Sequence, residues 1–176
     1  MKFLLTPVDG AYLVDLEPHE DQRGSFARTF CQEEFQRQGL PTQIRQSNLS
    51  NNPYQGTLRG LHYQVEPHCE AKLIRVVRGR VYDVIVDLRK ESPTFCQWFG
   101  TYLDDQECKA IFVPGGVAHG FLTLLKDTLI FYEMFEFHHP ESARGIRYDD
   151  PLLDIHWPAE IKVISEKDQH WPNFQP

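Results

Sequence analysis

The chain has 176 residues, of which 41% are hydrophobic and 12% aromatic, and it carries a formal net charge of −7. This length and composition predict one compact domain and exclude a disordered chain. The negative charge argues against nucleic acid or an acidic membrane as a partner, because either would be repelled, whereas a small phosphorylated ligand could still bind a local cluster of arginines.

Cysteine usage and the N-terminus bear on the cellular compartment. The four cysteines, Cys31, Cys69, Cys96 and Cys108, have neither CxxC nor zinc-finger spacing, so we expect reduced, partly buried thiols. The start Met1–Pro7 is too short for the apolar region of a signal peptide, and no apolar run approaches the length of a membrane span. We therefore expect a cytoplasmic protein without a membrane partner.

The first quarter of the chain predicts two strands and a helix. Residues Gly10–Leu16 alternate as a strand, and Glu17–Gly24 form a polar turn before a second strand over Ser25–Phe30. Residues Cys31–Gly39 predict a short helix, because carboxylates stand in its first turn and Gly39 can end it. This is the one helix that we expect before the C-terminal third.

The rest of the chain reads as a series of short strands. Strands are predicted over Gln43–Leu49, Leu73–Val77, Arg80–Leu88, Thr94–Leu103, Cys108–Val113, Phe121–Leu125 and Thr128–Phe137. Arg78 and Gly79 are expected to join two of them as a hairpin. Strands spaced eight to twelve residues apart are typical of an antiparallel sandwich or jelly roll. After Pro140 the composition predicts a tail wrapped over the barrel.

The stretch Gly56–Leu88 concentrates the side chains that can do chemistry. It carries Arg59, His62 and Lys72 in short extended segments. Residues an even number apart in a strand face the same side, and His62 and Lys72 are ten apart with a turn between them. Two strands could therefore aim both side chains into one cavity.

Several sequence blocks together carry a resemblance to a known family: Asp21–Phe26, Gln46–Ser50, Leu58–Gln64, Lys72–Leu73, Val84–Arg89, Ser92–Phe95, Pro114–Phe121 and Ser165–Asp168. With these blocks the chain resembles the dTDP-4-dehydrorhamnose 3,5-epimerase family of cupins over nearly its whole length. The resemblance implies an all-β cupin jelly roll with a few short peripheral helices, formed by residues 1–176 as a single domain. It also implies a homodimer whose N-terminal strands contribute to the partner's sheet.

Four residues suit the chemistry of such an enzyme. Epimerisation beside a ketone needs a base, a group that stabilises the enolate, and an acid on the opposite face. His62 suits the base, Asp168 its orienting carboxylate, Lys72 the enolate oxygen and Tyr132 the acid. The resemblance assigns the family's catalytic residues to the same four positions. Taken singly, three of the four have a structural alternative: His62 as a hydrogen-bonded histidine, Tyr132 as a packed tyrosine and Asp168 as a surface carboxylate.

The resemblance also implies the substrate-binding positions, which are Arg23, Phe26, Gln46, Asn48, Arg59 and His119. The two arginines match positions that contact the nucleotide diphosphate, and Arg23 is expected to reach the pocket of the partner subunit. Phe26 matches a residue beside the base, and the amides match polar positions of the pocket. A guanidinium fork fits phosphate oxygens, which agrees with these roles.

A metal site is a separate question, because many cupins hold a metal with three histidines and a carboxylate. Pro114–His119 matches the histidine of the second cupin motif, but Tyr63 and Gln64 follow His62 where a His-x-His pair is expected. Since a catalytic metal usually needs three protein ligands, we expect a metal-free site without a cofactor. His119 then becomes a pocket residue near the sugar.

The chain departs from the family pattern at Arg28, Glu133, Phe137 and His138. Several of these positions are expected near the nucleotide end of the pocket, so the carrier nucleotide stays open. Our hypothesis is an epimerase that inverts C3 and C5 of a 4-keto-6-deoxy nucleotide sugar, with dTDP as the default carrier. The alternatives are a C3-only epimerase, a CDP-, GDP- or UDP-linked substrate, a non-catalytic sugar-binding cupin and a metal-dependent cupin oxygenase.

Overall fold

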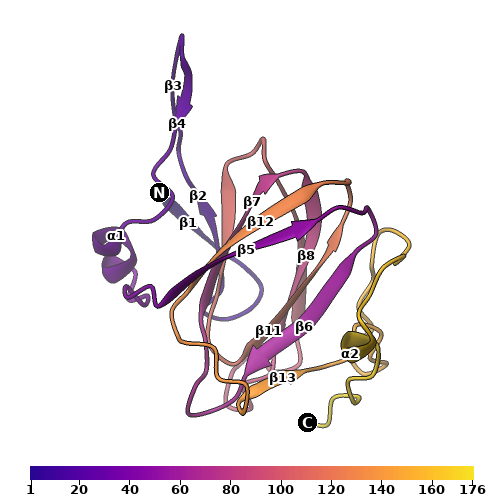
Figure 1. Cartoon of the computed structure of the whole chain (residues 1–176). Helices are drawn as coiled ribbons and strands as arrows, with labels where there is room; N and C mark the ends of the chain where they lie inside the picture. Colours follow the sequence, from indigo (N-terminus) through magenta and orange to yellow (C-terminus); the bar gives the residue numbers. More distant parts are fainter.

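The computed structural model describes residues 1–176 as a sandwich of two antiparallel sheets (Figure 1). The six-stranded sheet runs in the order β1 (Lys2–Leu5), β2 (Tyr12–Asp15), β10 (Lys109–Val113), β7 (Lys72–Arg78), β12 (Thr128–Met134), β5 (Gln46–Asn52). The five-stranded sheet runs in the order β13 (Ala143–Gly145), β6 (Leu58–Gln64), β11 (Val117–Thr123), β8 (Arg80–Asp87), β9 (Trp98–Asp104). The predicted all-β jelly-roll class is confirmed.

The remaining elements are short and peripheral. Strands β3 (His19–Asp21) and β4 (Gly24–Phe26) form a separate two-stranded hairpin that projects away from the sandwich (Figure 1). Helix α1 (Gln32–Arg37) lies beside the six-stranded sheet, and α2 (Glu166–Gln169) lies in the C-terminal tail. Neither helix is long and apolar enough to cross a membrane.

The core follows from the alternation of side chains along the strands. On β8, Val81 and Ile85 face the space between the sheets, while Val84 and Val86 face outward. The inner cluster of twelve buried residues includes Ile74, Ile111, Phe121 and Ile130 from four further strands. Burial of these apolar side chains supplies the main driving force that holds the two sheets together.

Each sheet is also covered on its outer face. Helix α1 inserts Phe35, which is fully buried, against Leu73 and Phe112 of the six-stranded sheet. The tail packs Leu153 and Ile155 onto the outer face of the five-stranded sheet. The tail thus covers one outer face of the sandwich, and the expected short peripheral helices are confirmed.

One predicted connection is wrong. Gly79 has the positive φ expected of it, +90°, but β7 and β8 do not pair as a hairpin. Strand β7 pairs with β10 and β12 in one sheet, and β8 pairs with β9 and β11 in the other. The chain crosses between the sheets at this glycine, where an added Cβ would lie 2.5 Å from Thr128 Oγ1.

Several element boundaries also differ from the prediction. Strand β1 was not predicted, and β3 lies within the segment predicted as a polar turn. The strand predicted over Ser25–Phe30 ends at Phe26, and the strand predicted over Phe121–Leu125 begins four residues earlier, directly after Gly116. The strand predicted from Thr94 begins only at Trp98, because residues 92–95 fold into a turn instead.

That turn is organised by the buried carboxylate of Asp87 at the end of β8. The carboxylate accepts hydrogen bonds from Arg89 Nε (2.8 Å), Ser92 Oγ (2.5 Å) and Thr94 Oγ1 (2.7 Å). Burial alone would raise the pKa of Asp87, but these hydrogen bonds outweigh it and lower the pKa to about 2. The sequence blocks Val84–Arg89 and Ser92–Phe95 therefore have a structural role.

Replacing Asp87 should destabilise the fold in a pH-dependent way. At pH 7, Asp87→Asn is expected to lower the free energy of unfolding by about 2 kcal/mol, because Arg89 loses its counter-charge. The folded pKa lies below the ordinary 3.8, so the carboxylate contributes its stability above about pH 4 and loses it as the pH falls toward 2. Urea unfolding at several pH values measures the difference between wild type and variant.

The matched control for this prediction is Asp154→Asn. The Asp154 side chain is 84% exposed, and its only ionic partner is His156 at 4.0 Å. This variant should unfold as the wild type does at every pH. An effect of Asp87→Asn no larger than that of Asp154→Asn would contradict the assigned role of Asp87.

Candidate active site

A cavity of about 590 Å³ opens between the two sheets. It adjoins a second cavity of about 510 Å³, and Asn48, His62 and Lys72 line both. Seven of the predicted site residues line the first cavity: Asn48, Arg59, His62, Lys72, His119, Tyr132 and Asp168. An eighth, Gln46, lines the second. The structure thus brings together residues that are up to 120 positions apart in the chain.

An irregularity in β6 lets two functional side chains face this cavity. His62 pairs with His119 of β11, but Arg59 pairs with Phe121, so three steps on β6 match two on β11. Without this extra residue, Arg59 and His62 would face opposite sides of the sheet. Gly60 lies in the bulge with φ +127°, and an added Cβ would lie 2.5 Å from Gly120 Cα. The bulge therefore requires glycine.

The side chain of His62 is held by the C-terminal tail. His62 Nε2 lies 2.6 Å from Asp168 Oδ1, which also accepts a hydrogen bond from Trp171 Nε1 at 3.2 Å. The other carboxylate oxygen accepts from the backbone N–H of Gly60 at 3.3 Å. An ionised carboxylate can only accept, so the proton of the imidazole lies on Nε2, and Nδ1 carries the free lone pair.

The environment of Asp168 keeps it ionised. Burial alone would raise its pKa, but the hydrogen bond with His62, the charge of that histidine, and the donors of Gly60 and Trp171 lower the pKa below its ordinary value. Ser165 positions this carboxylate, since its hydroxyl caps α2 by accepting from Asp168 N at 3.1 Å. The block Ser165–Asp168 is thus a capped turn that delivers a carboxylate to the histidine.

Lys72 enters the cavity from the opposite sheet. Its side chain is buried, and its Nζ lies 3.1 Å from Glu70 Oε1 and donates to the carbonyl oxygen of His62 at 3.2 Å. Lys72 pairs with Met134 on β12, which places it two positions from Tyr132 on the same face of the sheet. The ammonium group of Lys72 therefore lies in the same cavity as the histidine and the tyrosine.

Tyr132 stands on the wall of the cavity opposite His62. Its ring packs against the inner core, and its hydroxyl makes no hydrogen bond to another protein group. Burial raises the pKa of Tyr132 well above its ordinary value, and the nearby charge of Asp83 adds to that shift while Arg59 opposes it. Tyr132 is therefore a neutral phenol with a proton available to a ligand.

A second histidine and carboxylate pair lies deeper in the cavity. His119 Nε2 is 2.8 Å from Asp83 Oδ2, and both side chains are buried. The other oxygen, Oδ1, is buried without a hydrogen-bond partner. The His119 ring meets the Tyr132 ring edge to face, with 6.1 Å between centroids. Asp83 therefore fixes the histidine that lines the cavity beside the tyrosine.

The predicted phosphate-binding arginines have different surroundings. Arg59 lies at the mouth of the cavity, where its Nε donates to Asn52 Oδ1 at 2.8 Å and leaves its terminal nitrogens toward solvent. Arg23 and Phe26 lie outside both cavities on the projecting hairpin, where the Arg23 side chain is 89% exposed. Within one chain, the structure does not bring these two residues to the site.

Arg28 and Glu133, two of the departing residues, lie outside both cavities of the single chain. Glu133 follows Tyr132 on β12 and so faces the outer side of the sheet, where it pairs with Arg75 at 2.5 Å. Arg28 pairs with Glu34 at the base of α1. Of the four positions, only His138 lines a cavity.

Several site residues were missed in the sequence: Glu70, Asp83, Lys167 and Trp171. Asp83 interrupts the apolar inward face of β8 between Val81 and Ile85. A carboxylate at such a position indicates a polar partner in the interior of the sandwich. Lys167 lies within the block Ser165–Asp168 and stacks over Trp171, with 5.1 Å from its Nζ to the ring centroid. Nothing in the local pattern marked Trp171.

Comparison with known proteins adds to this geometry. The family model described as dTDP-4-dehydrorhamnose 3,5-epimerase matches residues 5–176. An enzyme of that name from Methanothermobacter thermautotrophicus is 43% identical, covering 97% of this chain and 92% of that protein. The crystal structure of the dTDP-4-dehydrorhamnose 3,5-epimerase from Elizabethkingia anophelis NUHP1 gives a TM-score of 0.95 at 37% identity, covering 99% and 96% of the two chains. A dTDP-6-deoxy-D-glucose-3,5-epimerase from Legionella pneumophila Philadelphia 1, in complex with dTDP-4-keto-L-rhamnose, gives 0.90 at 34% identity, covering 99% of both.

Substitution of Gly60 tests whether the bulge positions the site. Gly60→Ala is expected to lower the free energy of unfolding by about 3 kcal/mol or more, because the strained φ is combined with a clash against the backbone of Gly120. Gly39→Ala, outside the β3–β4 hairpin, is the control: its φ is +72°, but no atom lies within 4 Å of the added Cβ. The control should cost only about 1 kcal/mol. Equal losses in thermal unfolding would show that the close approach of β6 and β11 is unimportant.

Proposed function

Because this chain belongs to the dTDP-4-dehydrorhamnose 3,5-epimerase family, we propose that its cavity inverts C3 and C5 of dTDP-4-dehydro-6-deoxyglucose to give dTDP-4-dehydrorhamnose. One observation carries the catalytic assignment: His62 and Tyr132 face each other from opposite sheets across a single cavity. An inversion requires removal of a proton from one face of a carbon and delivery from the other. Side chains on two opposed walls of the cavity can act on the two faces of one carbon.

His62 is the base in this proposal. Its Nδ1 takes the proton of the carbon beside the C4 ketone, and the imidazolium that forms is stabilised by the ionised Asp168 at 2.6 Å. The same base serves C3 and C5, since both carbons flank the ketone. Gly60 N–H and Trp171 hold Asp168 in place, so these two residues support the base without touching the substrate.

Lys72 stabilises the enolate. When the proton leaves, negative charge develops on the oxygen at C4, and a buried ammonium lowers the energy of that charge more than water would. Glu70 and the carbonyl of His62 fix the ammonium before the substrate arrives. Such preorganisation avoids the cost of reorienting the charge during the reaction.

Tyr132 completes each inversion by protonating the enolate from the opposite face. Its raised pKa keeps the proton on the phenol until a strongly basic carbanion forms beside it. The phenolate left behind then regains a proton from solvent, and the imidazolium of His62 returns its proton to solvent, so both groups are reset for the second carbon. Each step moves only protons, so the proposed mechanism includes no cofactor.

The nucleotide diphosphate is proposed to lie at the mouth of the cavity. Arg59 and Lys167 line this region, and their positive charges suit phosphate oxygens. Gln46, Asn48 and His119 supply polar contacts deeper along the two cavities. All four cysteines are free thiols, which supports the proposed cytoplasmic location, where thiols stay reduced.

We further propose a homodimer in which the β3–β4 hairpin of each subunit reaches the site of its partner. All six strand residues of the hairpin are exposed, and Phe26 is 77% exposed. An isolated two-stranded hairpin is marginally stable in water, so an apolar side chain at this position suits an interface. The arrangement would bring Arg23 and Phe26 to the nucleotide.

Subunit mixing tests this proposal. Arg23→Ala should raise KM about tenfold or more, whereas Arg37→Ala, an exposed arginine of α1, should leave it unchanged. If Arg23 acts across subunits, each heterodimer of Arg23→Ala and His62→Ala has one intact site. Mixing the two variants under exchange should then restore about a quarter of wild-type activity. No restoration, or a mass of 20.6 kDa rather than twice that value in solution, would contradict the proposal.

Solvent exchange tests the reaction itself. Incubation of dTDP-4-keto-6-deoxyglucose with the protein in heavy water should place two deuterons on the sugar, detected by mass spectrometry. His62→Ala should slow the exchange at least about a hundredfold, and His156→Ala, on an exposed histidine, should not. One deuteron would identify a C3-only epimerase. No exchange with the folded wild type on dTDP-, CDP-, GDP- or UDP-linked sugars would leave a non-catalytic binding protein.

The same experiment separates the acid from the base. Tyr132→Phe should impair inversion more than exchange, because His62 can still remove a proton and return one from solvent on its own face. The measured quantity is the ratio of deuterium incorporation to formation of the inverted sugar. Equal loss of both would assign Tyr132 a structural role.

A further inference from the structure

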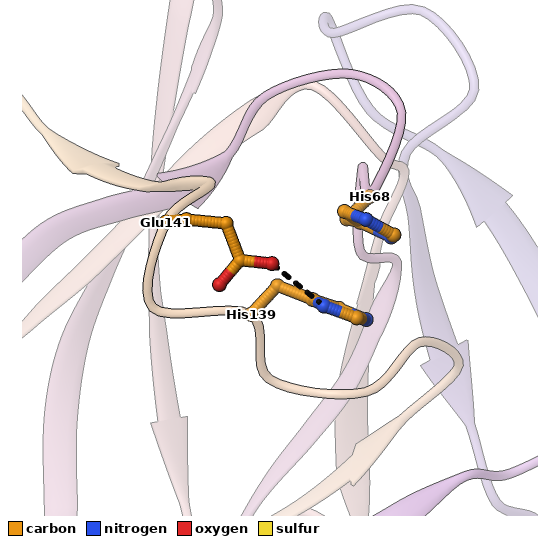
Figure 2. A group of neighbouring side chains, drawn as sticks. All are labelled: His68, His139 and Glu141. Atoms are coloured by element: carbon orange, nitrogen blue, oxygen red, sulfur yellow. Dashed lines mark hydrogen bonds and ion pairs between the residues drawn. The ribbon is translucent and has the colours of Figure 1, made fainter.

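Two histidines and a glutamate gather outside the proposed active site. His68 lies in the loop between β6 and β7, and His139 and Glu141 lie in the loop between β12 and β13 (Figure 2). One ligand atom from each side chain lies within 4.8 Å of the other two. We propose that these three residues bind a divalent transition-metal ion, zinc above all, which ties the two loops together.

The spacing of the ligand atoms fits such an ion. His139 Nδ1 lies 3.2 Å from Glu141 Oε1. Ligands about 2.0–2.1 Å from a tetrahedral zinc are separated by about 3.3 Å, so this pair already spans one edge of the coordination shell. The His68 ring lies against that of His139, with 3.5 Å between centroids and 10° between planes. A rotation of the half-buried His68 side chain would turn a ring nitrogen toward the ion.

The buried side chain of Gln64 on β6 hydrogen-bonds to the backbones of both loops. Gln64 Oε1 accepts from the backbone N–H of His139 at 2.6 Å. Its Nε2 donates to the carbonyl oxygens of His68 at 2.9 Å and Phe137 at 3.0 Å. Gln64 is only 1% exposed, so the amide has no freedom to exchange these partners for water. Both histidine backbones are thus fixed before any ion binds.

The backbone of each histidine has a second anchor. The N–H of His68 donates to Val65 O at 3.1 Å, and His139 O accepts from Ser142 N at 2.9 Å and from Ala143 N at 3.0 Å. Pro140 has a fixed φ and restricts His139 before it. Little chain entropy therefore remains to be lost on binding, which favours a specific site over a chance contact of surface histidines.

The ligand set selects the class of ion. Imidazole nitrogens suit zinc and its transition-metal neighbours, whereas magnesium and calcium prefer oxygen ligands throughout. Three protein ligands leave a position for water, and Glu141, whose side chain is 67% exposed, provides access from solvent. None of the three residues lines either cavity of the candidate active site, so this ion would be distinct from the epimerisation chemistry.

The proposal can be tested by calorimetric titration of the full chain with zinc chloride. The protein should carry no histidine tag and should first be treated with a chelator. The wild type should bind one zinc per chain. His68→Ala and His139→Ala should each weaken the affinity at least about tenfold, while His156→Ala should not change it. His156 is a suitable control, because it is a surface histidine whose one nearby carboxylate lies 4.0 Å away. Zinc should also raise the melting temperature of the wild type but not that of the first two variants.

Three outcomes would overturn the proposal. They are a wild type that binds no zinc, an affinity that His68→Ala and His139→Ala leave unchanged, and magnesium binding as tight as zinc binding. If the histidine variants fail to fold, Glu141→Gln decides the matter, since its exposed side chain is not needed for packing. That variant should retain the fold, bind zinc more weakly and lose part of the zinc-dependent rise in melting temperature.

Discussion

The carboxylate of Asp168 connects the C-terminal tail to the strand that bears His62, and the candidate site depends on this connection. It accepts from His62, from Trp171 and from the backbone of Gly60. Trp171 in turn packs so closely on β13 that a Cβ at Gly145 would lie 2.3 Å from its ring. The tail therefore does two things at once: it buries the outer face of one sheet, and it completes the histidine of the cavity.

The fold class was predictable because its signal is repeated along the chain. Short alternating segments separated by turn residues recur often enough that an error in one boundary does not alter the architecture. The connection at Gly79 was not predictable, since a positive φ and two flanking strands occur both in a hairpin and in a crossover between sheets. Only the packing of β7 against β12 and of β8 against β11 decides between them.

Most of the predicted site residues line the two cavities, but the way they reach them was not predictable. His62 and Lys72 line one cavity, but they reach it from different sheets, so parity along the chain does not explain their meeting. Parity also fails between Arg59 and His62 because of the bulge at Gly60. Trp171 and the cluster around His68 carry no local signal, because their partners are distant in sequence. The role of Arg23 cannot be assigned from one chain, since its side chain is 89% exposed and does not line the cavity of its own subunit.

The sandwich also holds two acids, Asp168 and Tyr132, in opposed environments at the candidate site. Burial acts on both Asp168 and Tyr132, but hydrogen-bond donors surround the first, and the charge of Asp83 adds to burial at the second. One acid therefore stays ionised and the other stays protonated. The ionised one is hydrogen-bonded to His62 of the five-stranded sheet, and the protonated one belongs to the six-stranded sheet. In the proposed mechanism, a substrate between His62 and Tyr132 would meet a proton acceptor on one face and a donor on the other, which is what an inversion requires.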